Sequence, residues 1–143
     1  MFDRELIEEK LSQITKYLSK LEPLANLPKL KFTDSDLHYQ AERFVELIVG
    51  SAIDINFHII KELNLDAPIK YKESFKVIAD AKILDHDLGY QIADSAGLRN
   101  IIVHHYDEID LDRFYDGLAG GIKDYQEYIK EINLYLKNNK GGK

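Results

Sequence analysis

Arg99 and His104 are the residues of this chain best suited to phosphate chemistry, and they flank the apolar run in the segment RNIIVHHYDEID. Arginine is always charged, and its planar fork matches the oxygens of a phosphate group. Histidine gains or loses a proton near pH 7 and can act as a general acid or base. Together they suit cleavage of a phosphodiester in RNA. The ribose 2′-OH would attack, the histidine would transfer a proton, and the arginine would stabilise charge on the phosphorane without a metal.

The spacing of Arg99 and His104 does not by itself aim both side chains at one phosphate. In a helix with about 100° per residue, Val103 lies about 40° from Arg99, whereas His104 lies about 140° away, on the face of Asn100. We therefore expect the helix to end near His104, or a second chain to complete the site. A buried salt bridge of the arginine and a helix-terminal histidine would account for both residues without catalysis.

Four segments form a pattern that extends beyond this pair. RNIIVHHY has the form R-x-x-x-x-H-x-Y, and Glu42-Arg43 is followed by IDINFH at residues 53–58. YKESF at residues 71–75 and YDEID at residues 106–110 complete the pattern. Over about residues 33–135, the chain thus resembles the HEPN superfamily and, within it, the HepT-like (DUF86) toxins of MNT–HEPN toxin–antitoxin pairs.

This resemblance implies an all-α, antiparallel bundle of four to five helices and a homodimer whose active cleft lies between the subunits. It implies a metal-independent endoribonuclease that cleaves cellular RNA, either tRNA or mRNA. Arg99 and His104 would be its catalytic residues, and Asn100 would support them. The chain would be the cytoplasmic toxin of a type VII-like toxin–antitoxin pair, and no cofactor is implied.

The resemblance also implies how such a toxin is silenced, and the residue concerned is Tyr106, the tyrosine of the pattern. In HepT-like proteins, a partner nucleotidyltransferase of the MNT type attaches AMP to this residue. A bulky nucleotide with a negative phosphate, two residues from His104, would block the cleft and repel RNA. The alternative function is a non-catalytic dimeric helical module that binds a nucleotidyltransferase or a nucleotide.

Two further residues are candidates for support of the site. His105 stands where many relatives have glycine, and it either assists His104 or caps the C-terminus of the helix, where a cation is favoured. We prefer the cap. Asp54 and His58 lie four residues apart on one helix, so Asp54 either reaches the cleft or bonds to His58. We favour the bond within the helix.

The remaining titratable groups suggest no second site. Gly50 stands where relatives often carry a glutamate, so no acidic role is transferred to it. A metal site built on His104 and His105 has no supporting spacing, and we expect no metal. His38 and His86 are expected at the surface near helix starts.

Apolar periodicity predicts five helices and no strand. They span about residues 3–24, 33–63, 73–84, 88–104 and 110–136, and glycines at 117, 120 and 121 interrupt the last one. Thr33 and Asp110 are the expected N-caps of the second and last helices. The second helix has two apolar stripes, which indicates burial against its own bundle and against a second copy. A close helix crossing would explain Gly50 in its middle.

Composition fits one domain, placed at residues 1–137, with a flexible tail at 138–143. The 143 residues are 45 % hydrophobic and include no cysteine, which excludes disulfides and cysteine-ligated zinc. No apolar run reaches the roughly 18 residues of a membrane span. The net charge of −6 argues against a protein that coats nucleic acid non-specifically. Lysines clustered at 29–31 and 70–76 either track a phosphate backbone or form a solvated face.

Overall fold

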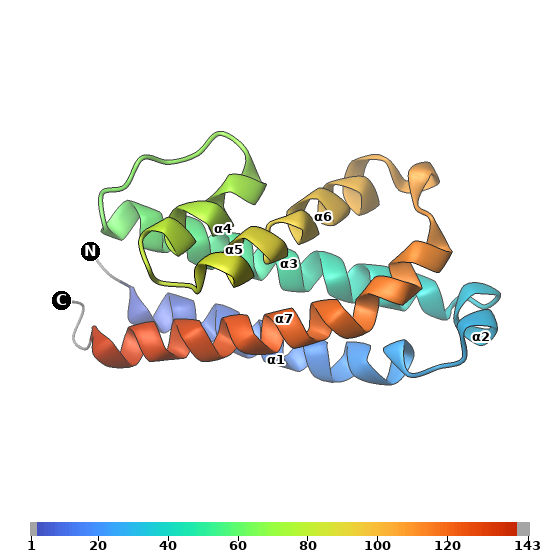
Figure 1. Cartoon of the computed structure of the whole chain (residues 1–143). Coiled ribbons are helices and arrows are strands. Elements are labelled where there is room, and N and C mark those ends of the chain that lie inside the picture. The colour runs from blue at the N-terminus through green and yellow to red at the C-terminus, as the bar shows by residue number, and fades with distance from the viewer. Residues whose placement is uncertain (1–2, 140–143) are drawn as a thin grey trace.

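The structure, a computed structural model, describes residues 3–139, and every regular element in this part of the chain is helical. Three long helices run along the molecule: α1 (Arg4–Ala25), α3 (Leu37–Glu62) and α7 (Leu111–Asn138). α1 runs antiparallel to the other two, as Figure 1 shows. Above them lie the shorter helices α4 (Tyr71–Asp80), α5 (His86–Ile92) and α6 (Asp94–His104). The predicted all-α antiparallel bundle is confirmed.

α3 is the central helix because its own chain covers it on two sides. α1 packs along one side of α3, and α4 and α6 pack on it from another. Val45, Val49, Ile53 and Ile60, from the second apolar stripe, are all buried. This stripe therefore does not require a second copy of the chain, and a dimer has to be argued from the site instead.

A buried polar network joins α7, α3 and α4. The Tyr128 hydroxyl donates to Oδ1 of Asn56 at 2.7 Å, and Nδ2 of Asn56 donates to Oγ of Ser74 at 3.1 Å. Oγ of Ser74 in turn donates to the carbonyl of Tyr71 at 2.7 Å. Buried polar groups cost free energy unless they are hydrogen-bonded, so this network holds α4 in one position on α3. It also holds the backbone of Tyr71 at the start of α4.

The connection between α1 and α3 contains a helix that the sequence did not predict, α2 (Lys29–Thr33). Its Phe32 is completely buried against two aromatic rings of α7. The Thr33 hydroxyl donates to the carbonyl of Lys29 at 3.0 Å and so belongs to the end of α2. The predicted N-cap at Thr33 is therefore wrong, and α3 begins at Leu37. A five-residue helix is too short to produce a readable apolar period.

Three other element boundaries differ from the prediction. The segment 88–104 is two helices, α5 and α6, which are separated at Ala93. The third predicted helix, 73–84, instead runs from Tyr71 to Asp80, and Lys82 then takes a positive φ of 66°. α7 is continuous through its glycines, so the predicted interruption is wrong.

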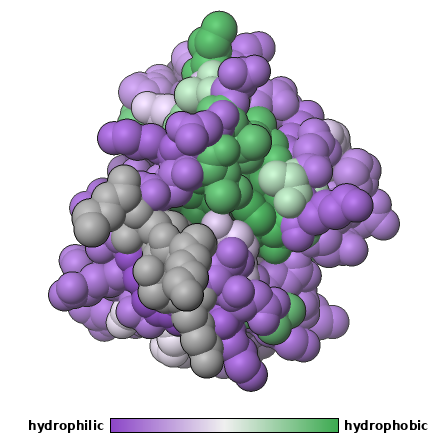
Figure 2. Space-filling model, turned by 90° about the vertical axis from the view of Figure 1, so that its left-hand side faces the viewer, coloured by the Kyte–Doolittle hydropathy of each residue, from purple (hydrophilic) through white to green (hydrophobic). Residues whose placement is uncertain are grey.

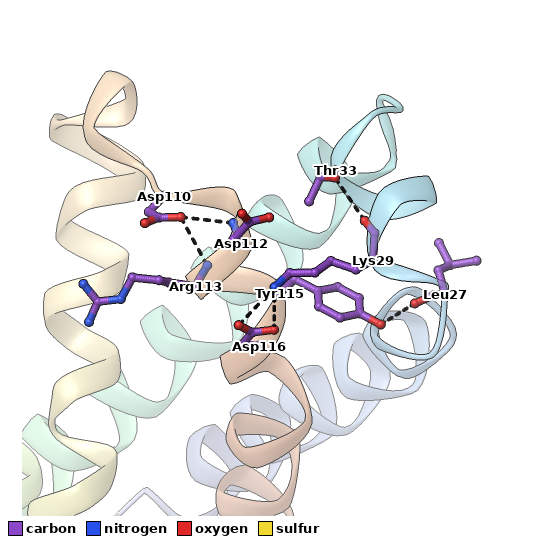
Figure 3. A network of polar contacts seen from close by, with 8 residues as sticks. All are labelled: Leu27, Lys29, Thr33, Asp110, Asp112, Arg113, Tyr115 and Asp116. Carbon is purple, nitrogen blue, oxygen red and sulfur yellow. Dashed lines mark hydrogen bonds and ion pairs between the residues drawn. The ribbon is translucent and has the colours of Figure 1, made fainter.

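The loop after α6 contains the short 3₁₀ helix η1 (Tyr106–Glu108) and leads into the N-cap of α7. The carboxylate of Asp110 accepts hydrogen bonds from the backbone N–H groups of Asp112 at 3.1 Å and Arg113 at 3.3 Å, as Figure 3 shows. The predicted helix end at His104 and the predicted N-cap at Asp110 are both confirmed.

Asp110→Ala is expected to lower the free energy of unfolding by about 1 kcal/mol, because two backbone donors at the start of α7 lose their acceptor. Urea denaturation followed by circular dichroism would measure the change. Asp110→Asn keeps an acceptor oxygen and is the matched control, so it should unfold near the wild-type midpoint. Equal stability of the alanine variant and the wild type would contradict this role of the cap.

The first lysine cluster takes part in an ion pair within the chain. Nζ of Lys29 lies 3.0 Å from Oδ1 of Asp116 in α7, and the Tyr115 hydroxyl donates to the carbonyl of Leu27 (Figure 3). The hydrogen bond from Lys29 to Asp116 raises the pKa of the lysine, so it is charged at neutral pH. These contacts fasten α2 to the start of α7.

Both termini lie at one end of the molecule, and Figure 2 shows an apolar patch there among hydrophilic side chains. A hollow of about 510 Å³ at the end of α3 is lined by Phe57, Ile60, Leu65 and Ala67, among others.

None of the helices formed by residues 3–139 is both long and apolar enough to cross a membrane. The single domain at 1–137 stays a prediction. Most of the predicted tail, from residue 140 on, lies outside the described residues, and Asn138 still belongs to α7.

Candidate active site

Arg99 lies in the middle of α6, and its guanidinium is directed towards Gly50 in the middle of α3. A Cβ atom added at Gly50 would lie 3.5 Å from Nε of Arg99 and 3.8 Å from Nη2. A longer side chain at this position would occupy the space of the guanidinium. The space at Gly50 is therefore filled by an arginine side chain and not by the close helix crossing that was predicted to explain this glycine.

The guanidinium of Arg99 has an unused donor. Among the buried side-chain nitrogen and oxygen atoms of residues 3–139, Nε of Arg99 is the one without a hydrogen-bond partner. Arg99 lines a cavity of about 280 Å³ together with Gly50, Asp54, Phe57 and Tyr71. Because the guanidinium is always charged and Arg99 lines this cavity, an anion in the cavity would be stabilised by it.

Asp54 lies in the same cavity as Arg99, so its position agrees with a role near the cleft. Its carboxylate forms an ion pair with Lys10 of α1, with Nζ and Oδ2 3.1 Å apart. Nε2 of His58 accepts a hydrogen bond from the backbone N–H of Asp3 at 3.0 Å. Both side chains of this pair on α3 therefore contact the N-terminal helix and its cap, a contact that their spacing in the sequence could not reveal.

His104 is the last residue of α6, and His105 is the C-cap. Both side chains are exposed, and within residues 3–139 the imidazole of His104 has no hydrogen-bond or ion-pair partner. Nδ1 of His105 lies 3.4 Å from Oε2 of Glu108, so His105 is engaged at the end of the helix. This position agrees with the cap and leaves His104 as the free imidazole of the segment.

Asn100 is exposed and lines a second cavity of about 360 Å³ with Ile69, Lys70, Tyr71 and Lys72. Because α6 is helical through His104, Arg99 and His104 keep the wide angle expected from their spacing. One chain thus brings Arg99 and Asp54 into one cavity and places Asn100 in the next. It leaves His104 at the end of the helix.

Tyr106 lies in η1 and is 44 % exposed. Its ring stacks on that of Tyr39, with centroids 6.1 Å apart. Partial burial and a hydrogen bond with Glu42 raise the pKa of its hydroxyl, so the phenol is neutral at physiological pH.

Glu42 itself is 3 % exposed, and its Oε2 lies 2.8 Å from Nδ1 of His38. His38 is therefore buried, and its predicted place at the surface is wrong, whereas His86 is exposed as predicted.

Sequence patterns missed part of this arrangement. In the sequence, Glu42 belongs only to the family pattern, and nothing there indicates that it reaches Tyr106. Tyr71 also belongs to that pattern, and the lysines on both sides of this aromatic residue are a usable signal for nucleic-acid binding. Among residues 3–139, no group of three or more histidine, aspartate or glutamate side chains could hold a metal ion.

The chain is an all-helical bundle with Arg99 in the middle of α6 and His104 at its end. The model of the family described as "Ribonuclease HepT-like" matches residues 7–132, and the chain belongs to this family. It is 35 % identical to the tRNA nuclease HepT of Aphanizomenon flos-aquae over 132 residues, which are 92 % of this chain and 90 % of that protein. It is 30 % identical to the mRNA nuclease HepT of Shewanella oneidensis over 82 residues, 57 % of this chain and 62 % of that protein.

Solved structures share the fold. A tri-AMPylated HEPN toxin of Shewanella oneidensis in complex with an MNT antitoxin aligns with a TM-score of 0.81 and 24 % identity, over 92 % of this chain and 99 % of that one. A cytosolic protein of unknown function from Bacillus subtilis aligns with a TM-score of 0.84 and 18 % identity, over 98 % of this chain and 94 % of that one. The predicted HepT-like family and ribonuclease activity are confirmed by the family model and by the two nuclease relatives.

Proposed function

We propose that this chain is a metal-independent endoribonuclease toxin that cleaves cellular RNA, tRNA or mRNA, in the cytoplasm, with Arg99 and His104 as its catalytic residues. The observation that carries this proposal is that Arg99 lines a cavity beside Gly50, about one and a half turns before an exposed histidine at the end of the same helix, and that neither Nε of Arg99 nor the His104 imidazole has a partner within residues 3–139. The 35 % identity to a tRNA nuclease supports it.

In the proposed reaction, the ribose 2′-oxygen forms a bond to the adjacent phosphorus, and the bond to the 5′-oxygen of the next nucleotide breaks. The proton of the 2′-OH leaves to a base, and a proton is delivered to the departing 5′-oxygen, so the products are a cyclic phosphate and a 5′-hydroxyl. His104 transfers one of these protons. Arg99 binds the phosphate oxygens and stabilises the charge of the phosphorane. Asn100 and Asp54 support the site from its two sides.

We propose that the active cleft lies between two copies of the chain. Arg99 is directed towards α3, whereas His104 is exposed at the end of α6, so one chain does not present both groups from one helix face. In a twofold-symmetric dimer, the His104 side chain of one subunit can meet the Arg99 cavity of the other. Cleavage of RNA by the wild-type chain, and its loss in variants of these two residues, tests the catalytic assignment.

A mixture of the Arg99→Ala and His104→Ala proteins, unfolded and refolded together, is expected to regain about a quarter of the wild-type activity per chain. Half of the random dimers are heterodimers, and each of these has one intact site of two. Gel assays of RNA cleavage would measure the activity, with each variant refolded alone as the control. An inactive mixture, with heterodimers present by native mass spectrometry, would place the whole site within one chain.

We further propose that a nucleotidyltransferase of the MNT type is the partner of this chain and that Tyr106 is the residue it modifies. Tyr106 is exposed enough to be reached, and it lies on the short helix directly after His104 and His105. The shared fold with a tri-AMPylated toxin bound to its antitoxin supports this proposal.

A further inference from the structure

Tyr71 has a side chain that contributes little to the fold of its own chain. It is the first residue of α4 and is 58 % exposed. Its one ring contact among the described residues is with Phe57, edge to face, with the ring centroids 6.0 Å apart. Within residues 3–139 its hydroxyl has no hydrogen-bond partner. The backbone, by contrast, is held by the Ser74 hydroxyl, so an exposed ring is presented from a fixed position.

Tyr71 lies between two parts of the candidate active site. It lines the cavity of about 280 Å³ that contains the Arg99 guanidinium. It also lines the neighbouring cavity of about 360 Å³ that contains Asn100. A phosphate bound to Arg99 would therefore bring its attached nucleoside next to this ring.

On the side of Asn100, the cavity beside Tyr71 is positively charged although the chain as a whole is acidic. Lys70 and Lys72 line the same cavity as Asn100, and in the described part of the chain neither forms an ion pair. The neighbouring carboxylate of Glu73 is engaged by Lys76, with Nζ and Oε2 3.7 Å apart. Aromatic rings flanked by cations are the usual means by which proteins hold unpaired bases and the strand that carries them.

We infer that Tyr71 is a stacking platform for a nucleobase of single-stranded RNA, next to the phosphate bound by Arg99, and that Lys70 and Lys72 bind the adjoining backbone. This inference rests on the proposed ribonuclease function and deepens it, because it defines the form of RNA that the site accepts. An unpaired base can reach the ring, whereas a base within a duplex is covered by its neighbours. The site therefore selects loops and single-stranded ends.

The absence of tryptophan from the chain allows a direct test. In a His104→Ala background, the Tyr71→Trp variant is titrated with a short single-stranded RNA and with the same RNA in a duplex. The single strand is expected to quench the tryptophan fluorescence, and the duplex is expected to quench it far less. Unchanged fluorescence while the RNA binds by anisotropy, or equal quenching by the duplex, would overturn the inference.

Tyr90 supplies the matched control. It is also an exposed tyrosine, and Nζ of Lys76 lies 5.3 Å from its ring centroid, but it is outside both cavities. Tyr90→Trp in the same background should bind RNA without quenching.

Affinity and cleavage give an independent readout. Tyr71→Ala is expected to weaken binding of the single strand roughly 5- to 100-fold, whereas Tyr71→Phe keeps the ring and the affinity. Wild-type affinity of Tyr71→Ala would overturn the inference while RNA cleavage by the wild type remained. Failure of the proposed function looks different, because the wild-type chain itself would then leave RNA intact.

Discussion

Arg99→Ala and His104→Ala are each expected to abolish the growth arrest and the RNA cleavage that are proposed for the wild-type chain. Loss of a general acid or base costs about 10²–10⁴-fold in rate, and loss of one donor to a developing oxyanion costs about 10²–10³-fold. Because such groups act as a unit, the double variant should lose little more than either single variant. Gel analysis of RNA incubated with purified, unmodified protein would measure the rates, and growth after induction would report toxicity.

Two controls sharpen this experiment. His105→Ala removes the neighbouring imidazole, which is engaged by Glu108, and it should keep nearly wild-type cleavage. Arg99→Lys keeps the charge but loses the planar fork, so partial activity is expected. Wild-type rates of RNA cleavage in both Arg99→Ala and His104→Ala would refute the catalytic assignment. A wild-type chain that binds its nucleotidyltransferase but leaves RNA intact would instead support the non-catalytic binding module.

Co-expression with an active nucleotidyltransferase is expected to add one or more AMP units to Tyr106 and to abolish RNA cleavage. In this step the phenolic oxygen attacks the α-phosphorus of ATP, pyrophosphate leaves, and the phenolic proton passes to a base. The raised pKa of Tyr106 means that the proton is still present at neutral pH and must be removed. The new phosphate would carry negative charge at the end of α6, where it blocks RNA from approaching His104.

Intact-mass spectrometry and peptide mapping would detect this modification. Tyr106→Phe should acquire no AMP, should keep its nuclease activity and should escape neutralisation by the partner. Tyr39→Phe is the matched control, because Tyr39 stacks on Tyr106 but is not the proposed acceptor, and it should be modified like the wild type. Two results would reject Tyr106 as the modified residue: AMP attached to another residue, or no attached AMP after co-expression with an active partner.

Sequence periodicity was enough for the long elements of the fold. α1, α3 and α7 each bury one or two apolar stripes over many turns, and such stripes are readable without coordinates. It failed for α2, which has five residues and is held by Phe32 against α7. It also failed at Ala93, where the apolar pattern continues although the helix ends.

The sequence alone determined the residue types of the site and its family, because R-x-x-x-x-H-x-Y and its companion segments are local patterns. Only the tertiary structure decided what those residues face. The contact of Arg99 with Gly50, the position of Tyr71 between two cavities and the approach of Glu42 to Tyr106 join distant segments. The packing of α6 and η1 on α3, and of α4 beside them, creates these contacts, and helical spacing within one element cannot encode them.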